Sequence, residues 1–129
     1  METLTEFTII HDDRPGTLSD LGILLAGQGI NIRSMAAVPA PDKRGVVRLI
    51  VDDIEKAQSV LTEAGIGHSA RSVLAVEISN EPGSLGGVAK YLAGYDINIE
   101  SLYVLESAPG TITIVLGVDR LDEARDLLA

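Results

Sequence analysis

The chain has 129 residues, 46% of them hydrophobic and only 3% aromatic, which allows an aliphatic core in one ordinary domain or in two very small ones. Its formal net charge of −9 disfavours nucleic-acid binding, and the lack of cysteine excludes disulfides, thiolate metal sites and a cysteine nucleophile. The acidic N-terminal sequence METLTEF is unlike a signal peptide, and no run of about 18 apolar residues predicts a membrane span. We therefore expect a cytoplasmic protein.

The first half of the chain predicts six elements in the order strand, helix, strand, strand, helix, strand. The segment Phe7–His11 alternates and is rich in β-branched residues, as in a strand, and Pro15–Gly16 predicts a tight turn before a helix. Gly27 and Gly29 provide the stop of that helix. The predicted elements are a strand at 7–11, a helix at 16–28, strands at 30–38 and 46–51, a helix beginning near Asp53 and a strand at 68–72.

The second half repeats the first with an offset of 67 residues, without a gap from Phe7 to Ala129. Arg-Pro-Gly-Thr-Leu at 14–18 returns as Glu-Pro-Gly-Ser-Leu at 81–85, and Gly-Ile-Asn-Ile at 29–32 returns as Asp-Ile-Asn-Ile at 96–99. The repeated elements are a strand at 74–78, a helix at 83–94, strands at 97–105 and 112–118, and a helix beginning near Asp119. The helices are predicted to bury apolar stripes formed by Leu18, Leu21 and Leu25, by Ile54, Ala57 and Leu61, by Leu85, Val88 and Leu92, and by Leu121, Ala124 and Leu128.

The order βαββαβ predicts an α+β, ferredoxin-like fold in which two helices cover one face of an antiparallel sheet. We expect two tandem domains, at 1–72 and 73–129, the second without its last strand. An open sheet edge needs cover, and three explanations compete. The edge is short and exposed, a neighbouring subunit covers it, or residues 1–6 or the long strand at 68–79 cross over. The first two are favoured equally over the third.

The candidate binding element is the turn between the first strand and the first helix of each copy. A helix N-terminus exposes backbone N–H groups and a partial positive charge. Gly16 or Gly83 in this turn would let a carboxylate or phosphate approach the backbone closely. A Pro-Gly pair also makes a tight turn for purely structural reasons, and both interpretations stay open.

Polar side chains near this turn are candidates for reading the amino and carboxyl groups of a ligand. Asn31 and Asn98 begin the second strand of each copy, and an amide both donates and accepts hydrogen bonds. Such an Asn can equally close the turn after the helix. Asp13 could pair with an ammonium group and Asn80 could hydrogen-bond one, although such residues in turns also bond their own backbone.

Residues that would carry catalysis or bind a metal are missing. His11 ends the first strand and has Ile78 as its counterpart, while His68 lies among small residues, so the two histidines do not predict a metal site. The sequence contains no GxSxG, Walker or HExxH motif. We therefore predict a protein that is not an enzyme and has no cofactor or metal.

The copies resemble the ACT domain, a small amino-acid-binding regulatory module of metabolic enzymes. The resemblance rests on His-Asp-Asp-Arg-Pro-Gly-Thr-Leu…Gln-Gly-Ile-Asn-Ile in the first copy, on Ser-Asn-Glu-Pro-Gly-Ser-Leu…Tyr-Asp-Ile-Asn-Ile in the second, and on the βαββαβ order. It covers nearly the whole chain, as in small stand-alone tandem-ACT proteins. It implies a ligand between two ACT domains, against the loop from first strand to first helix, and domains that pair side by side.

The resemblance also implies which positions contact the ligand: His11, Asp13, Arg14, Gly16, Thr17, Leu18 and Asn31 in the first copy, and Asn80, Gly83, Ser84, Leu85 and Asn98 in the second. The first copy keeps the histidine of serine-binding members but has Asp13 where they have Asn. The second copy keeps both Asn residues and lacks the histidine. Two equivalent sites, one composite site and one degenerate site all remain open.

The leading functional hypothesis is a non-enzymatic, allosteric amino-acid sensor. Its ligand would lie at the interface between ACT domains of a homodimer. The protein would act on a partner enzyme or regulator of amino-acid metabolism, and we expect it to bind neither nucleic acid nor a membrane. The first alternative is an interaction or assembly module without a ligand. The second is a small acylphosphatase-like enzyme with Arg14 against phosphate, which Glu81 at the equivalent position and the acidic composition disfavour.

Overall fold

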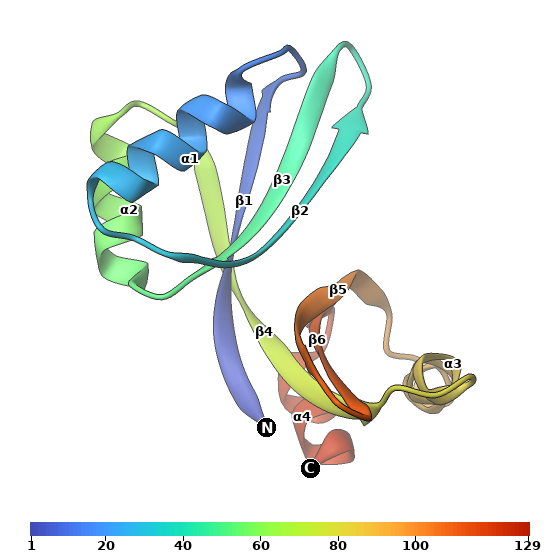
Figure 1. Cartoon of the computed structure of the whole chain (residues 1–129). Coiled ribbons are helices and arrows are strands. Elements are labelled where there is room, and N and C mark those ends of the chain that lie inside the picture. The colour runs from blue at the N-terminus through green and yellow to red at the C-terminus, as the bar shows by residue number, and fades with distance from the viewer. The chain divides into compact units, whose positions relative to one another are not determined.

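A computed structural model describes all residues, 1–129, and contains six strands and four helices in two compact units (Figure 1). The first unit is Thr5–Arg71, and the second unit combines Met1–Leu4 with Ser72–Ala129. Two long strands, β1 (Glu2–Asp12) and β4 (His68–Ser79), contribute residues to both units. The predicted order of elements is confirmed, with the strands predicted at 68–72 and 74–78 joined in β4.

In the first unit, two helices cover one face of a sheet with the strand order β2-β3-β1-β4 (Figure 1). Besides β1 and β4 it contains α1 (Thr17–Gly27), β2 (Ile32–Ala40), β3 (Arg44–Val51) and α2 (Ile54–Glu63). Both β1 and β2 run antiparallel to β3. Because side chains alternate along a strand, one face is apolar. The buried core consists of Phe7, Ile9, Leu21, Leu25, Ile30, Val47, Leu49, Val51, Ala57, Val60 and Leu61.

The second unit repeats this arrangement with α3 (Ser84–Ala93), β5 (Ile99–Ala108), β6 (Thr111–Val118) and α4 (Leu121–Leu128). Its strand order is β1-β4-β6-β5, where β1 is represented by Met1–Leu4. The core is again aliphatic, as the low aromatic content predicts. Its buried members are Leu74, Val76, Leu92, Ile97, Ile114, Leu116, Val118 and Ala124.

The sheet edge that the sequence leaves open in the second copy is covered from within the chain. The start of β1 lies beside β4 in the second unit, and Leu4 there is only 9% exposed. The two favoured explanations, a short exposed edge and cover by another subunit, are therefore wrong, and the crossing by N-terminal residues is right. The physical reason is that β1 begins at Glu2 instead of at the predicted Phe7. The additional residues at its start extend past the first unit and pair with β4 in the second.

The predicted helical stripes are buried in part, with Val88, Leu121 and Leu128 only partly buried. Leu21, Leu25 and Leu92 are fully or almost fully buried, whereas Leu18 and Leu85 are 41% and 43% exposed. Ile54 in α2 is likewise exposed. Each exposed residue lies in the first turn of its helix, and Leu18 borders a pocket instead of the core. None of the four helices is both long and apolar enough to cross a membrane.

The two aspartates predicted near helix starts have different roles. Asp53 caps α2, because its Oδ1 accepts a hydrogen bond from the Lys56 backbone N–H at 3.1 Å. Asp119 does not cap α4, where the N-cap is Arg120. Its Oδ1 instead accepts from the Asn98 backbone N–H at 3.0 Å, although the helix begins near Asp119 as predicted. The 67-residue offset pairs Asp119 with Asp52 rather than with Asp53.

The first unit buries one carboxylate. Glu6 is 1% exposed, and its Oε1 accepts a hydrogen bond from Arg71 Nε at 3.1 Å. Arg48 Nε lies 4.0 Å from the same oxygen and has no hydrogen-bond partner. At the equivalent positions of the second unit, Val73 and Val115 are fully buried. The repeat therefore has a charged cluster in one copy where the other is apolar.

Candidate functional site

The loop between β1 and α1 carries the special backbone geometry of the candidate site. Gly16 is the N-cap of α1 and has a φ of 95°, and Gly83 at the equivalent position before α3 has a φ of 90°. This left-handed conformation strains any residue with a Cβ, which explains the glycine. No side chain caps either helix. Backbone N–H groups in the first turn of each helix are thus available to an anion.

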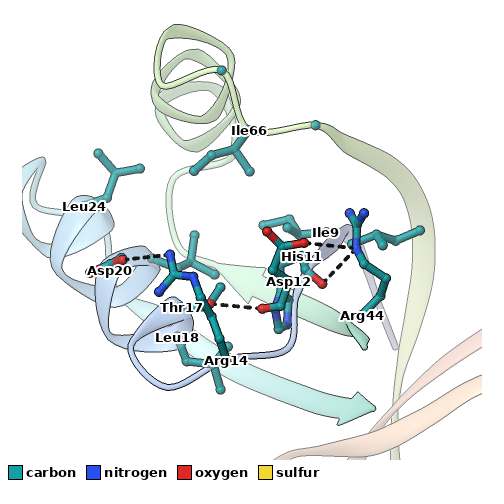
Figure 2. Close-up of a pocket in the computed structure, with 14 residues that line it drawn as sticks. Ile9, His11, Asp12, Arg14, Thr17, Leu18, Asp20, Leu24, Arg44 and Ile66 are labelled. Atoms are coloured by element: carbon teal, nitrogen blue, oxygen red, sulfur yellow. Dashed lines mark hydrogen bonds and ion pairs between the residues drawn. The ribbon is translucent and has the colours of Figure 1, made fainter. Parts of the chain in front are cut away.

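A pocket of about 500 Å³ opens beside this loop in the first unit, between α1, β1 and the segment before β4 (Figure 2). This volume lies within the usual range for small-molecule sites. We call it the first-unit pocket. It is lined by Ile9, Ile10, His11, Asp12, Arg14, Thr17, Leu18, Asp20, Leu21, Leu24, Arg44, Gly65, Ile66 and Gly67.

Two loose ion pairs lie on the wall of this pocket. The Arg14 guanidinium is 3.7 Å from the Asp20 carboxylate, and Arg44 Nε is 3.6 Å from the Asp12 carboxylate. These separations exceed the 2.7–2.9 Å or so of a strong charge-assisted hydrogen bond, and all four side chains are exposed, so the groups can turn toward a ligand. Thr17 Oγ1 donates to the Asp12 backbone carbonyl at 3.0 Å and ties α1 to β1 (Figure 2).

The opposite side of the pocket is apolar. In Figure 2, Leu24 from α1 and Ile66 from the segment before β4 lie on the same side of the charged groups. Both pack against the first-unit core, where Ile9 and Leu21 are 3% and 6% exposed. The pocket therefore combines a charged wall with an aliphatic one.

His11 is positioned by a close approach to the backbone of β3. Its ring stands over Gly45, its partner in the strand register, where an added Cβ would meet the ring at 2.6 Å. The His11 carbonyl accepts from Arg44 Nε at 3.2 Å, and His11 Nδ1 is 2.8 Å from the Asp12 carbonyl. In the second unit the equivalent pair is Ile78 and Ile112. The space that Gly45 leaves for the ring therefore belongs to the first unit alone.

A smaller pocket of about 200 Å³ adjoins the same loop and the end of β2. His11, Arg14 and Leu18 line both pockets, and Asp13 joins them here. The remaining lining residues are Ala37, Val38 and Pro39 at the end of β2. The loop thus lines two cavities of the first unit.

The second unit has a pocket of about 440 Å³ at the equivalent place. Ile78, Ser79, Ser84, Gly87, Val88 and Tyr91 line it at positions equivalent to His11, Asp12, Thr17, Asp20, Leu21 and Leu24 of the first-unit pocket. Gly83 and Leu128 complete its lining, so no charged side chain lines it. The fold repeats the pocket, and the sequence changes its chemistry.

Four of the predicted first-copy positions meet in the first-unit pocket: His11, Arg14, Thr17 and Leu18. Gly16 shapes the adjoining loop, and Asp13 lines the smaller pocket. In the second unit, Gly83 and Ser84 line the equivalent pocket, whereas Asn80 and Leu85 do not. The Asn80 backbone N–H bonds to the Gly110 carbonyl at 3.0 Å.

Asn31 and Asn98 do not line either pocket. The Asn31 backbone N–H donates to Asp52 Oδ1 at 2.9 Å, and its carbonyl accepts from the Asp52 N–H at 3.1 Å. Asn98 and Asp119 repeat both bonds. The backbone of each Asn thus ties the start of one strand to the end of its neighbour, and the amide side chains stay predicted ligand contacts.

Sequence reasoning missed Asp12, Asp20, Arg44 and Ile66 as pocket residues. Arg44 is the first residue of β3 and reaches the site because the register pairs it with Asp12. Asp20 lies one helical turn beyond Gly16, so the helical period was an available signal. Ile66 arrives through the α2–β4 connection, for which the sequence offers no signal. His68 packs edge-on against Phe7 at 5.9 Å, and no group of three or more His, Cys, Asp or Glu is arranged to hold a metal ion.

A family model for the ACT domain pair matches residues 2–129. The chain belongs to the ACT domain family. The predicted fold class, two tandem ferredoxin-like ACT domains, is thereby confirmed. No curated protein sequence matches the chain.

Solved structures share the ACT pair fold. A protein from Bacteroides thetaiotaomicron has 22% identity and a TM-score of 0.88, covering 98% of this chain and 86% of its own. The ligand-free regulatory subunit of aspartate kinase from Thermus thermophilus has 19% identity and a TM-score of 0.70, covering 96% and 87%. The corresponding subunit from Thermus flavus has 20% identity and a TM-score of 0.70, covering 99% and 88%.

Proposed function

We propose that this ACT pair is a non-catalytic sensor that binds a free amino acid in the first-unit pocket. The observation that carries the proposal is the meeting of the predicted loop residues with paired charges there. Arg14 and Arg44 offer guanidinium groups to a carboxylate, and Asp12 and Asp20 offer carboxylates to an ammonium group. The uncapped first turn of α1 adds backbone donors for the ligand carboxylate.

The regulatory part of the proposal rests on family membership. The Thermus thermophilus protein of similar fold is a regulatory subunit of aspartate kinase. We propose that this chain likewise transmits the presence of an amino acid to a partner enzyme or regulator. Such coupling requires the ligand to bind one conformational state better than another.

A second copy of the chain is the proposed cover for the loop. Ile10 and Val38 flank Val46 in the register of the first-unit sheet and are 59% and 57% exposed, and Leu18 in α1 is 41% exposed. Exposed apolar side chains around a loop are typical of an interaction surface. We expect a homodimer by light scattering, and Leu18→Glu should weaken it. If light scattering finds the wild-type chain monomeric both with and without ligand, the dimer is wrong, and the sensor proposal is unaffected.

Thermal shift and titration calorimetry of the full chain against the twenty amino acids test the sensor. A ligand at a hundredfold excess over its Kd stabilises the folded state by about 2.7 kcal/mol. Arg14→Ala and Arg44→Ala should weaken binding at least tenfold, because each removes a charged contact. The repeat provides matched controls at the equivalent positions, Glu81→Ala and Thr111→Ala, which should leave affinity unchanged. If no amino acid binds, the sensor proposal is wrong and the alternative of a ligand-free interaction module takes its place.

A further inference from the structure

The charges of the first-unit pocket are balanced. Its wall carries two guanidinium groups, from Arg14 and Arg44, and two carboxylates, from Asp12 and Asp20. The two loose pairs leave each charge free to exchange its partner for a ligand group. A zwitterion, with one carboxylate and one ammonium group, keeps this balance when it binds.

The other polar lining residues, His11 and Thr17, lie beside the charged groups, and Thr17 Oγ1 already donates to the Asp12 carbonyl (Figure 2). The aliphatic wall of the pocket offers nothing to a charged or strongly polar ligand side chain. Leu21, Leu24, Ile9 and Ile66 are aliphatic, and Ile9 and Leu21 are buried. A charge placed against this wall would lose its hydration without gaining a partner, which is costly. An aliphatic side chain would gain affinity with each methylene that it buries there.

We infer that the ligand is a neutral amino acid with a branched aliphatic or thioether side chain, such as leucine, isoleucine, valine or methionine. This inference rests on the proposed function and names the class of ligand for the same site. The carboxylate and ammonium groups face the charged wall, and the side chain lies against Leu24 and Ile66. Lysine and aspartate are rejected because each brings a third charge to the apolar wall.

The second-unit pocket does not share this ligand. It has Ile78, Ser79 and Gly87 where the first-unit pocket has His11, Asp12 and Asp20, and no charged side chain lines it. Ser79 Oγ and Ser84 Oγ bond to each other at 2.8 Å. A zwitterion would find no counter-charge in this lining. Each chain therefore binds one amino acid, in the first unit.

Titration calorimetry with the full chain separates this inference from the proposed function. We expect leucine to bind with a stoichiometry of one per chain and at least tenfold more tightly than alanine, because several methylenes are buried. Lysine, aspartate and serine should bind at least tenfold more weakly than leucine. Serine, lysine or aspartate as the tightest ligand would overturn the inference and leave the sensor intact, and no binding by any amino acid would overturn both.

Two leucine analogues test the charge balance. 4-Methylpentanoate lacks the ammonium group and 3-methylbutylamine lacks the carboxylate, and we expect each to bind at least tenfold more weakly than leucine. Equal affinity of either analogue would overturn the zwitterion requirement. A stoichiometry of two per chain would overturn the assignment of a single site.

Leu24→Ala tests the apolar wall through a ratio of two affinities, which does not depend on how stable the variant is. It should reduce the ratio of leucine to alanine affinity at least threefold, because the alanine side chain does not reach position 24. Tyr91→Ala, at the equivalent position of the second-unit pocket, is the matched control and should leave the ratio unchanged. An unchanged ratio in Leu24→Ala, or a change in Tyr91→Ala, would contradict the inferred pose.

Discussion

Gly45 and His11 depend on each other, because the ring occupies the space where a Cβ of residue 45 would lie, at 2.6 Å. We predict that Gly45→Ala displaces the ring and destabilises the fold by about 1 kcal/mol. In a His11→Ala background the same change should stabilise by about 0.5 kcal/mol, because the clash is gone and the unfolded chain is stiffer. Urea unfolding of the four proteins of this double-mutant cycle measures the difference, and additive effects would contradict the contact.

Glu6 is a buried carboxylate beside Arg48 and Arg71, whereas its counterpart in the second copy is the buried Val73. Glu6→Val should destabilise the chain by about 3 kcal/mol, because Arg71 and Arg48 lose their common partner. Adding Arg48→Val, which copies Val73 and Val115 of the second unit, should recover part of that loss, since a buried charge is removed. Chemical denaturation compares the variants. A double variant less stable than Glu6→Val would show that Arg48 stabilises the fold without Glu6.

At the scale of elements, the loop between β1 and α1 and the loop between β4 and α3 both require a residue with a positive φ. Gly16→Ala and Gly83→Ala should each cost about 1–2 kcal/mol, because their φ angles of 95° and 90° lie in the left-handed region. Gly22→Ala is the control, since it lies within α1 with nothing within 4 Å of an added Cβ, and it should stabilise by about 0.5–1 kcal/mol. Thermal unfolding of the three variants measures these signs. A neutral Gly16→Ala would contradict the loop geometry.

Elements were the level at which the sequence predicted best. The period of the helices and the alternation of the strands located all four helices and every strand, because each pattern is local and appears twice in the chain. The errors lie at the ends. β1 begins at Glu2, and the buried stripes of α1 and α3 start after Leu18 and Leu85, because pairing and packing partners far along the chain decide where an element ends.

At the scale of the whole molecule, the N-terminal residues belong structurally to the C-terminal part of the chain. Deletion of residues 2–4 should expose the β4 edge of the second unit and lower hydrogen-exchange protection of its β4 amides at least tenfold, because unpaired backbone groups open to water. The control is Thr3→Ala, which keeps the backbone and loses only an exposed contact with Arg125, with an expected effect within about 0.5 kcal/mol. Unchanged β4 protection in the deletion variant would contradict this pairing.

The sequence by itself determined the two tandem ACT domains, their elements, their aliphatic cores and the candidate binding loop. Those features depend on local periodicity, on glycine where φ is positive, and on a motif present in both copies. It also identified His11, Arg14, Thr17 and Leu18, because these residues belong to the loop itself.

Only the tertiary structure decided which residues complete the pocket. Arg44 and Ile66 come from other parts of the first unit and meet the loop through strand register and chain connection, and neither leaves a local pattern. The same holds for the covered edge of the second unit, since pairing between Met1–Leu4 and β4 joins segments that are distant in the chain. Long-range pairing therefore decides which residues complete each pocket, whereas the substitutions between the two copies decide its chemistry.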